Sequence, residues 1–170
     1  MSVQLPPTGK YTADPQRSSI TFTTRHMFGL GKVKGTFGLE SASVVVAEPV
    51  NESTVRASID AAGVDTGTAR RDKDIRSAKF LDTERHPTIV FESTGVARGE
   101  GGTWLIQGLL TVRGHQEPIE LTVDALTVTG GSLRISASTT IDRYAHRVTA
   151  AKGMAARRLQ LSLNVTADPE

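Results

Sequence analysis

Residues 63–96 read GVDTGTARRDKDIRSAKFLDTERHPTIVFESTGV and interrupt a chain that otherwise alternates like one strand after another. Helical spacing over residues 69–79 lets Ile75 face inward while the charged side chains stay in water. His86-Pro87 ends this stretch, because the residue before a proline is pushed out of the α region. The stretch therefore predicts one short helix set into a sheet, followed by a return to strand.

The rest of the chain alternates apolar and polar residues with the period of two that is typical of half-buried strands. The clearest example is residues 158–165, and turn sequences such as Gly130-Gly131 separate such segments. We therefore predict an all-β fold with one short helical insertion, built from about eight or nine antiparallel strands. Closure into a barrel would remove the exposed edges of the sheet, although the periodicity alone also allows a sandwich.

Length and composition predict one globular domain, since the chain has 170 residues with 38% hydrophobic and 22% charged residues. Residues 1–10 are interpreted as a loose leader and residues 11–168 as a single β-barrel domain. No apolar run approaches the roughly 20 residues of a membrane-spanning helix, and no signal peptide is visible, so we expect a cytoplasmic protein. The absence of cysteine excludes disulfides and thiolate metal sites.

The net charge of only +2 argues against a nucleic-acid partner. Basic residues nevertheless gather in two segments, residues 70–79 and residues 142–158. These segments are interpreted either as solvated charge or as the flanks of a site for an anionic group.

The four histidines show no metal-binding spacing, and the closest pair in sequence is 29 positions apart. We expect no metal, no cofactor and no catalytic residue. His26 shares a predicted strand face with Phe22, which leaves open a core histidine or a polar contact at a pocket mouth. Asp65-Thr66-Gly67 has the same sequence as the D-T-G triplet of aspartic proteases, but here it leads into a charged helix, so we do not interpret it as a catalytic site. Asp65 is expected to be a turn residue, and Asp72 a partner for Arg71 or for a backbone N–H.

The central stretch also resembles the YceI-like family, which carries an ordered D-T-G, R-D, S-x-x-F-x-D and P-x-I-x-F-x-S series there. The early Arg25-His26 followed by V-x-G-x-F at residues 33–37 matches the family as well, and so does W-x-I-x-G-x-L-T-V-x-G at residues 104–114. Together these motifs span roughly residues 11 to 166. The resemblance implies an extended, lipocalin-like antiparallel barrel of about eight strands. It also implies binding of polyisoprenoids, such as prenyl phosphates or quinone tails.

We therefore expect a lipid-binding protein, not an enzyme, that holds a long isoprenoid-type ligand in an apolar barrel cavity for transport, storage or sequestration. The ligand would be a hydrophobic small molecule, namely an isoprenoid, a quinone or a fatty lipid. The residues expected to line the apolar cavity are Ile20, Phe22, Phe37, Phe80, Phe91, Trp104, Ile106, Leu110, Leu121, Leu161 and Leu163. The residues expected at its polar mouth are His26, Arg70, Arg71, Lys73, His146 and Arg147.

The chain departs from the family pattern at two places. Arg17-Ser18 stands where the family often has His-Ser, and His146-Arg147 replaces the Phe-Gly of a later R-x-x-F-G-V motif. The second change puts two large polar residues in a loop that is expected to border the pocket, where they would alter ligand size or head-group preference.

Two other functions remain open from the sequence. One is an enzyme for a hydrophobic substrate, with His26 or His146 as general base. The other is a ligand-free stress or interaction protein with a packed barrel. The sequence also leaves open whether the protein forms a homodimer.

Overall fold

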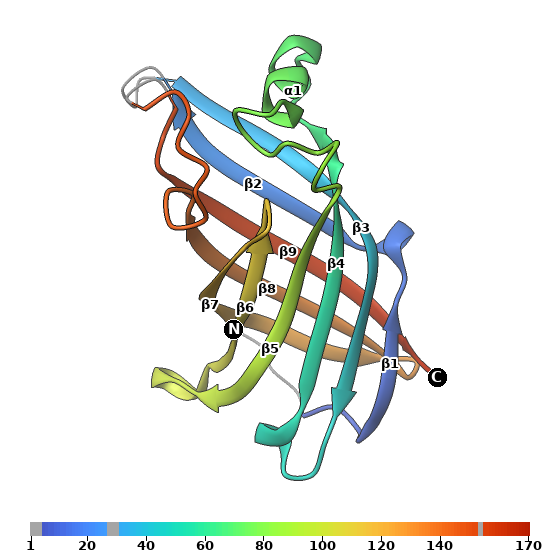
Figure 1. Cartoon of the computed structure of the whole chain (residues 1–170). Coiled ribbons are helices and arrows are strands. Elements are labelled where there is room, and N and C mark those ends of the chain that lie inside the picture. The colour runs from blue at the N-terminus through green and yellow to red at the C-terminus, as the bar shows by residue number, and fades with distance from the viewer. Residues whose placement is uncertain (1–4, 27–30, 153–154) are drawn as a thin grey trace.

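The computed structural model describes residues 5–26, 31–152 and 155–170, without the side chains of Arg25 and His26. Strands dominate these residues, and a single α-helix, α1 (Ala69–Arg76), lies among those described (Figure 1). The strands are β1 (Gly9–Ala13), β2 (Ser19–His26), β3 (Gly31–Val46), β4 (Thr54–Asp65), β5 (Thr88–Arg98), β6 (Trp104–Val112), β7 (His115–Thr129), β8 (Ser132–Asp142) and β9 (Arg158–Pro169). Short 3-10 helices occur at η1 (Pro15–Arg17), η2 (Val50–Glu52) and η3 (Glu100–Gly102).

The strands close into an antiparallel barrel. Neighbouring strands follow the order β3-β2-β9-β8-β7-β6-β5-β4, and β4 pairs back onto β3. Closure through eight strands leaves the barrel without a free edge, which is the usual solution for an antiparallel sheet of this size. The predicted all-β barrel with one helical insertion is confirmed.

The ninth strand, β1, pairs with β3 and β9, the same two strands that β2 pairs with, but farther along the barrel. Tyr11 of β1 pairs with Val44 of β3, and Ala13 pairs with Ala167 of β9. The other halves of β3 and β9 pair with β2. β1 begins at Gly9, so the last two residues of the predicted leader belong to the sheet, while residues 1–4 lie outside the described part.

The barrel has two dissimilar ends. α1 and the connection between β8 and β9 lie at one end, whereas η2 and η3 lie at the other (Figure 1). Leu133 of β8 and Ala167 of β9 are register partners with no exposed surface, and they belong to a buried cluster that includes Tyr11 of β1. Within the described residues, no helix has the length and apolar character needed to cross a bilayer.

The turn before α1 is fixed by two aspartates. Asp65 accepts a hydrogen bond from the backbone N–H of Gly67 at 2.8 Å, as expected for a turn residue. Asp72 is buried and its Oδ1 accepts from both the backbone N–H and the hydroxyl of Thr66, at 2.8 Å and 2.6 Å. The hydroxyl bond is the main cause that lowers the pKa of Asp72. The predicted backbone partner for Asp72 is therefore confirmed.

α1 ends earlier than residues 69–79 suggested. The last helical residue is Arg76, and Ser77 is already extended with ψ of 166°. Arg76 instead ties the helix to the barrel, because its guanidinium donates to the carbonyl oxygens of Ala62 and Val64 of β4 at 2.8 Å and 3.1 Å. The helix is thus held over the end of β4.

Candidate functional site

A cavity of about 430 Å³ lies inside the barrel beneath α1 and the β8–β9 connection. Seven strands supply its wall, and the wall is aliphatic and aromatic except for Thr24 on β2. The wall residues are Ile20, Phe22 and Thr24 of β2, Val33 and Phe37 of β3, Ile59 of β4, Ile89 of β5, Leu110 and Val112 of β6, Ile141 of β8, and Leu159 and Leu161 of β9. The volume is in the range that holds one drug-sized molecule.

The first part of the cover comes from α1 and the segment that follows it. Arg71, Asp74 and Ile75 line the cavity from the helix, and Lys79, Phe80 and Leu81 line it from the next residues. Arg113 in the β6–β7 turn holds this segment in place, since its Nη1 donates to the carbonyl oxygen of Phe80 at 2.8 Å. The helical insertion therefore covers the cavity and contributes both apolar and charged groups to its rim.

The second part of the cover is the β8–β9 connection, and Arg143 organises it. The guanidinium of Arg143 donates to the carbonyl oxygens of Ala156, Val148 and Ala155, at 2.8 Å, 2.9 Å and 3.0 Å. These three bonds fold the connection back on itself. Arg143 lines the cavity although it is only 7% exposed, and burial lowers the pKa of its guanidinium.

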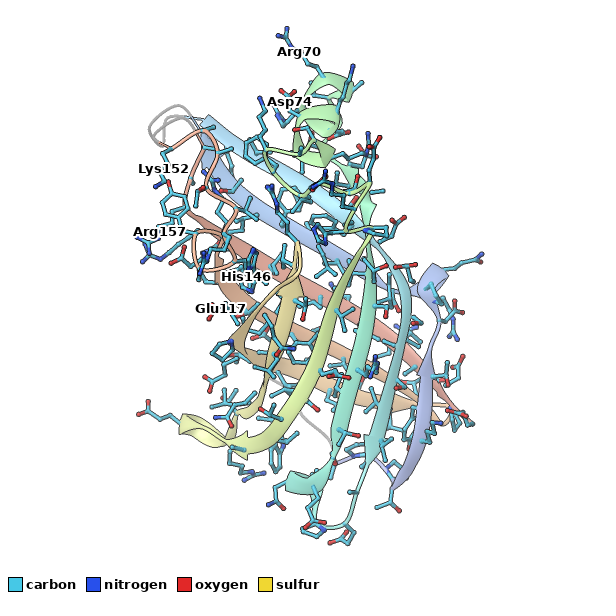
Figure 2. All side chains as sticks on the ribbon, viewed as in Figure 1. Arg70, Asp74, Glu117, His146, Lys152 and Arg157 are labelled. Carbon is cyan, nitrogen blue, oxygen red and sulfur yellow. The ribbon has the colours of Figure 1, made fainter. Side chains whose placement is uncertain are left out.

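His146 lies in the same connection and is buried against the barrel wall (Figure 2). Its Nε2 lies 3.2 Å from the carbonyl oxygen of Leu110 on β6, and its Nδ1 lies 3.4 Å from that of Asp142. Both ring nitrogens thus face backbone acceptors. The tautomer that carries its proton on Nε2 donates to Leu110 over the shorter distance and so tethers the connection to β6.

Asp142 at the end of β8 is paired with Arg157, the residue just before β9. Nε of Arg157 lies 2.9 Å from both carboxylate oxygens, and Nη2 lies 2.8 Å from Oδ2. The hydrogen bond from Arg157 is the main cause that lowers the pKa of Asp142. Arg157 and Lys152 lie on the outer side of this connection (Figure 2), so the ion pair closes the base of the loop outside the cavity.

The structure brings six of the predicted apolar residues together around the cavity, namely Ile20, Phe22, Phe37, Phe80, Leu110 and Leu161. The other five do not line it. Phe91 and Leu121 are buried in packed core, and Leu163 packs against the same core. Trp104 and Ile106 line a separate hollow of about 70 Å³ that shares no lining residue with the cavity. Five of the eleven residues predicted to line the cavity therefore lie outside it, in the packed core or around the smaller hollow.

Only some of the residues predicted at the polar mouth line the cavity. Arg71 and His146 line the cavity, whereas Arg70, Lys73 and Arg147 are exposed and do not. Arg70 points away from the barrel at the outer side of α1 (Figure 2), because only one face of this short helix meets the barrel end. His26 belongs to β2, but its side chain lies outside the described part of the structure.

Several lining residues were missed. Ile89, Val112 and Leu159 have the strand parity of the predicted residues Phe91, Leu110 and Leu161, so extending each predicted face along its strand would have found them. Arg143 and Val148 carry no such signal, because they lie in an irregular connection. Among the described residues, no three histidine or acidic side chains gather as metal ligands would.

An antiparallel barrel of eight strands with an apolar cavity beneath a cover of apolar and charged residues has the architecture of small ligand-binding barrels, a class that includes lipocalins. The chain belongs to the YceI-like family, because the model of the YceI-like domain matches residues 11–167. This match confirms the family that the motifs had suggested.

Curated relatives include UPF0312 proteins of Azotobacter vinelandii, which is 36% identical over 105 residues, and of Ectopseudomonas mendocina, which is 37% identical over 105 residues. Each alignment covers 61% of this chain and 54% of the relative. The chain therefore matches a little over half the length of these relatives.

Solved structures share the fold at low sequence identity. Burkholderia cenocepacia BcnA has a TM-score of 0.80 at 20% identity, covering 91% of this chain and 98% of BcnA. A polyisoprenoid binding domain from Saccharophagus degradans has a TM-score of 0.72 at 13% identity, covering 94% and 98%. At these identities the likeness establishes the fold alone.

Proposed function

We propose that this protein is a non-enzymatic carrier or sequestering protein for an isoprenoid-type lipid. The observation that carries the proposal is the apolar cavity of about 430 Å³ that the barrel wall and its cover line. Membership of the YceI-like family and the fold shared with a polyisoprenoid binding domain support the same function.

The physical basis of binding is tail burial. Each CH₂ group that leaves water for an apolar wall contributes about 0.8 kcal/mol, so a short tail can be held without any catalytic group. Apolar side chains such as Ile20, Ile59 and Ile141 offer a tail no polar partner, and the polar groups are concentrated in the cover. This arrangement suits a molecule with an apolar tail and a polar end at the cover.

The size of the cavity favours a short tail. The interior beyond the cavity is packed by residues such as Phe91 and Leu121, so a tail has no continuous path along the whole barrel. We therefore expect a farnesyl-sized or similar chain to be enclosed. A longer polyprenyl or quinone tail would leave part of its length outside the cover.

The arrangement of His146 favours binding over catalysis. A general base needs a ring nitrogen directed at the substrate, and both nitrogens of His146 face backbone carbonyl oxygens. The cavity also favours a ligand-binding protein over a barrel packed throughout. The carrier function is thus the one that these observations support best.

Native mass spectrometry of the purified protein, followed by organic extraction, tests this proposal. We expect a co-purified isoprenoid, quinone or fatty species, or stoichiometric uptake of farnesyl phosphate added to the stripped protein. A clean unliganded mass, with no uptake of prenyl phosphates, prenols or quinones, would contradict it.

A further inference from the structure

Arg143 is a buried cation that lines an apolar cavity. Only 7% of its surface is exposed, and its neighbours across the cavity are strand side chains such as Leu110 and Ile141. Its guanidinium has five N–H groups, and the bonds to Ala155, Ala156 and Val148 use three of them. Its hydrogen-bonding capacity is therefore greater than the loop alone requires.

No carboxylate among the described residues forms a direct ion pair with Arg143, and Asp142 acts on its charge only at longer range. Its acidic neighbour in sequence, Asp142, has both oxygens bound by Arg157. The segments outside the described part, residues 1–4, 27–30 and 153–154, contain no Asp or Glu. Aromatic rings lie near the guanidinium instead, with centroids at 5.8 Å for Phe80 and 5.0 Å for Tyr144.

A buried cation of this kind is unusual, because buried charges are normally paired with an opposite charge. Carbonyl oxygens and aromatic faces compensate part of the lost hydration but supply no negative charge. Burial accordingly lowers the pKa of Arg143, while its guanidinium stays protonated as arginine does in proteins. A ligand in the cavity would supply the directly bound counter-charge that Arg143 lacks.

The rim of the cavity also carries more positive than negative charge. Arg71 and Lys79 line it from the α1 side against a single acidic residue, Asp74. These rim groups are more exposed than Arg143, so water screens their effect. They would assist the entry of an anion more than they would hold it.

We infer that the cavity binds a lipid with an anionic terminal group, a carboxylate or a phosphate, and that the guanidinium of Arg143 binds this group at the covered end. The inference rests on the proposed lipid-binding function and adds the chemistry of the head group. It also moves the head-group contact from Arg70, Arg71 and Lys73, which the sequence suggested, to a residue of the β8–β9 connection.

Three ligands with the same tail test the inference on the unaltered protein. Farnesyl phosphate, farnesoic acid and farnesol are titrated separately by calorimetry, below the concentrations at which they aggregate. We expect one or both anions to bind at least about tenfold more tightly than farnesol, the scale of one charge-assisted hydrogen bond. Preference for the phosphate or for the acid would assign the head group.

Variants then assign the effect to Arg143. Arg143→Gln removes the charge, and we expect it to abolish the preference for anions while farnesol still binds. Arg134→Gln is the matched control, because Arg134 is exposed on β8 and does not line the cavity. Circular dichroism checks the fold of each variant, and the ligand comparison on the unaltered protein needs no variant to fold.

The possible results distinguish the head-group inference from the proposed lipid-binding function. Equal affinities of the three ligands for the unaltered protein would overturn the anionic head-group inference and leave lipid binding intact. An anion preference that Arg143→Gln retains in a folded variant would overturn the role of Arg143. No binding of any of the three would overturn both the inference and the proposed function.

Discussion

The ring of Phe22 on β2 covers Gly35, its register partner on β3. A Cβ atom at Gly35 would lie 2.5 Å from Cζ of Phe22 and 3.0 Å from the carbonyl oxygen of Asp65, both shorter than any ordinary contact. The ring also lies 5.3 Å from that of Phe37, centroid to centroid. The glycine thus gives the ring a place against the barrel wall, which leaves the adjoining space to the cavity.

Gly35→Ala is expected to lower the free energy of unfolding by about 1–3 kcal/mol, the usual cost of overpacking a core. The added methyl group would push the ring of Phe22 toward the cavity or shift the backbone of β3. Urea denaturation measures the change. Gly38→Ala on the same strand is the matched control, since its Cβ would meet no atom closer than 4.0 Å. A loss of stability in Gly38→Ala as large as in Gly35→Ala would contradict this explanation.

Arg147 adopts a left-handed backbone with φ of 64° and is exposed, at the position where the family motif has glycine. Such a conformation costs an L-residue about 1–2 kcal/mol, which exceeds the extra chain entropy of glycine of about 0.5–1 kcal/mol. We therefore expect Arg147→Gly to raise the free energy of unfolding by about 0.5–1 kcal/mol. Arg134→Gly within β8 should instead lower it. Equal losses in the two variants would show that the backbone of Arg147 is not strained.

The pair between Asp142 and Arg157 predicts an acid-dependent contribution to stability. Because the pKa of Asp142 is lower in the folded protein than in the unfolded chain, the stabilisation is complete above the unfolded value, near pH 4, and is lost as the pH falls through the folded value. We expect the stability of the wild type to decrease more steeply from about pH 5 to pH 2 than that of Asp142→Asn. Urea titrations across this range give the slopes, and parallel slopes would exclude a contribution from the pair.

Alternation along strands predicted which residues face the interior but not how far along the barrel they lie. Ile20, Phe22 and Leu161 therefore line the cavity as expected, whereas Leu121 and Trp104 lie elsewhere in the interior. The height of a side chain depends on strand tilt and register, which the period of two does not specify.

The sequence was least informative outside the strands. The first two residues of β1, Gly9 and Lys10, were interpreted as part of a leader, because a five-residue strand next to Pro6-Pro7 has little pattern of its own. Arg143 was not predicted to be a site residue, although it belongs to a family motif. Its burial depends on three carbonyl oxygens that only the folded connection brings together. The helix was predicted, yet its spacing alone could not say that Arg71 would reach the cavity and Arg70 would not.

The central claim is that the cavity beneath α1 holds an apolar tail. Val33 is buried and lines this cavity, whereas Val45 on the same strand is 37% exposed and does not line it. Val33→Phe would fill the cavity, and Val45→Phe makes the same change on the outer surface of the barrel.

Titration calorimetry with farnesyl phosphate, with inorganic phosphate as the tail-free control, is the most direct measurement. We predict one saturable site in the wild type and in Val45→Phe, at least about tenfold weaker binding in a folded Val33→Phe, and no comparable binding of inorganic phosphate. Equal affinities in all three proteins, or no binding to the wild type, would contradict the account.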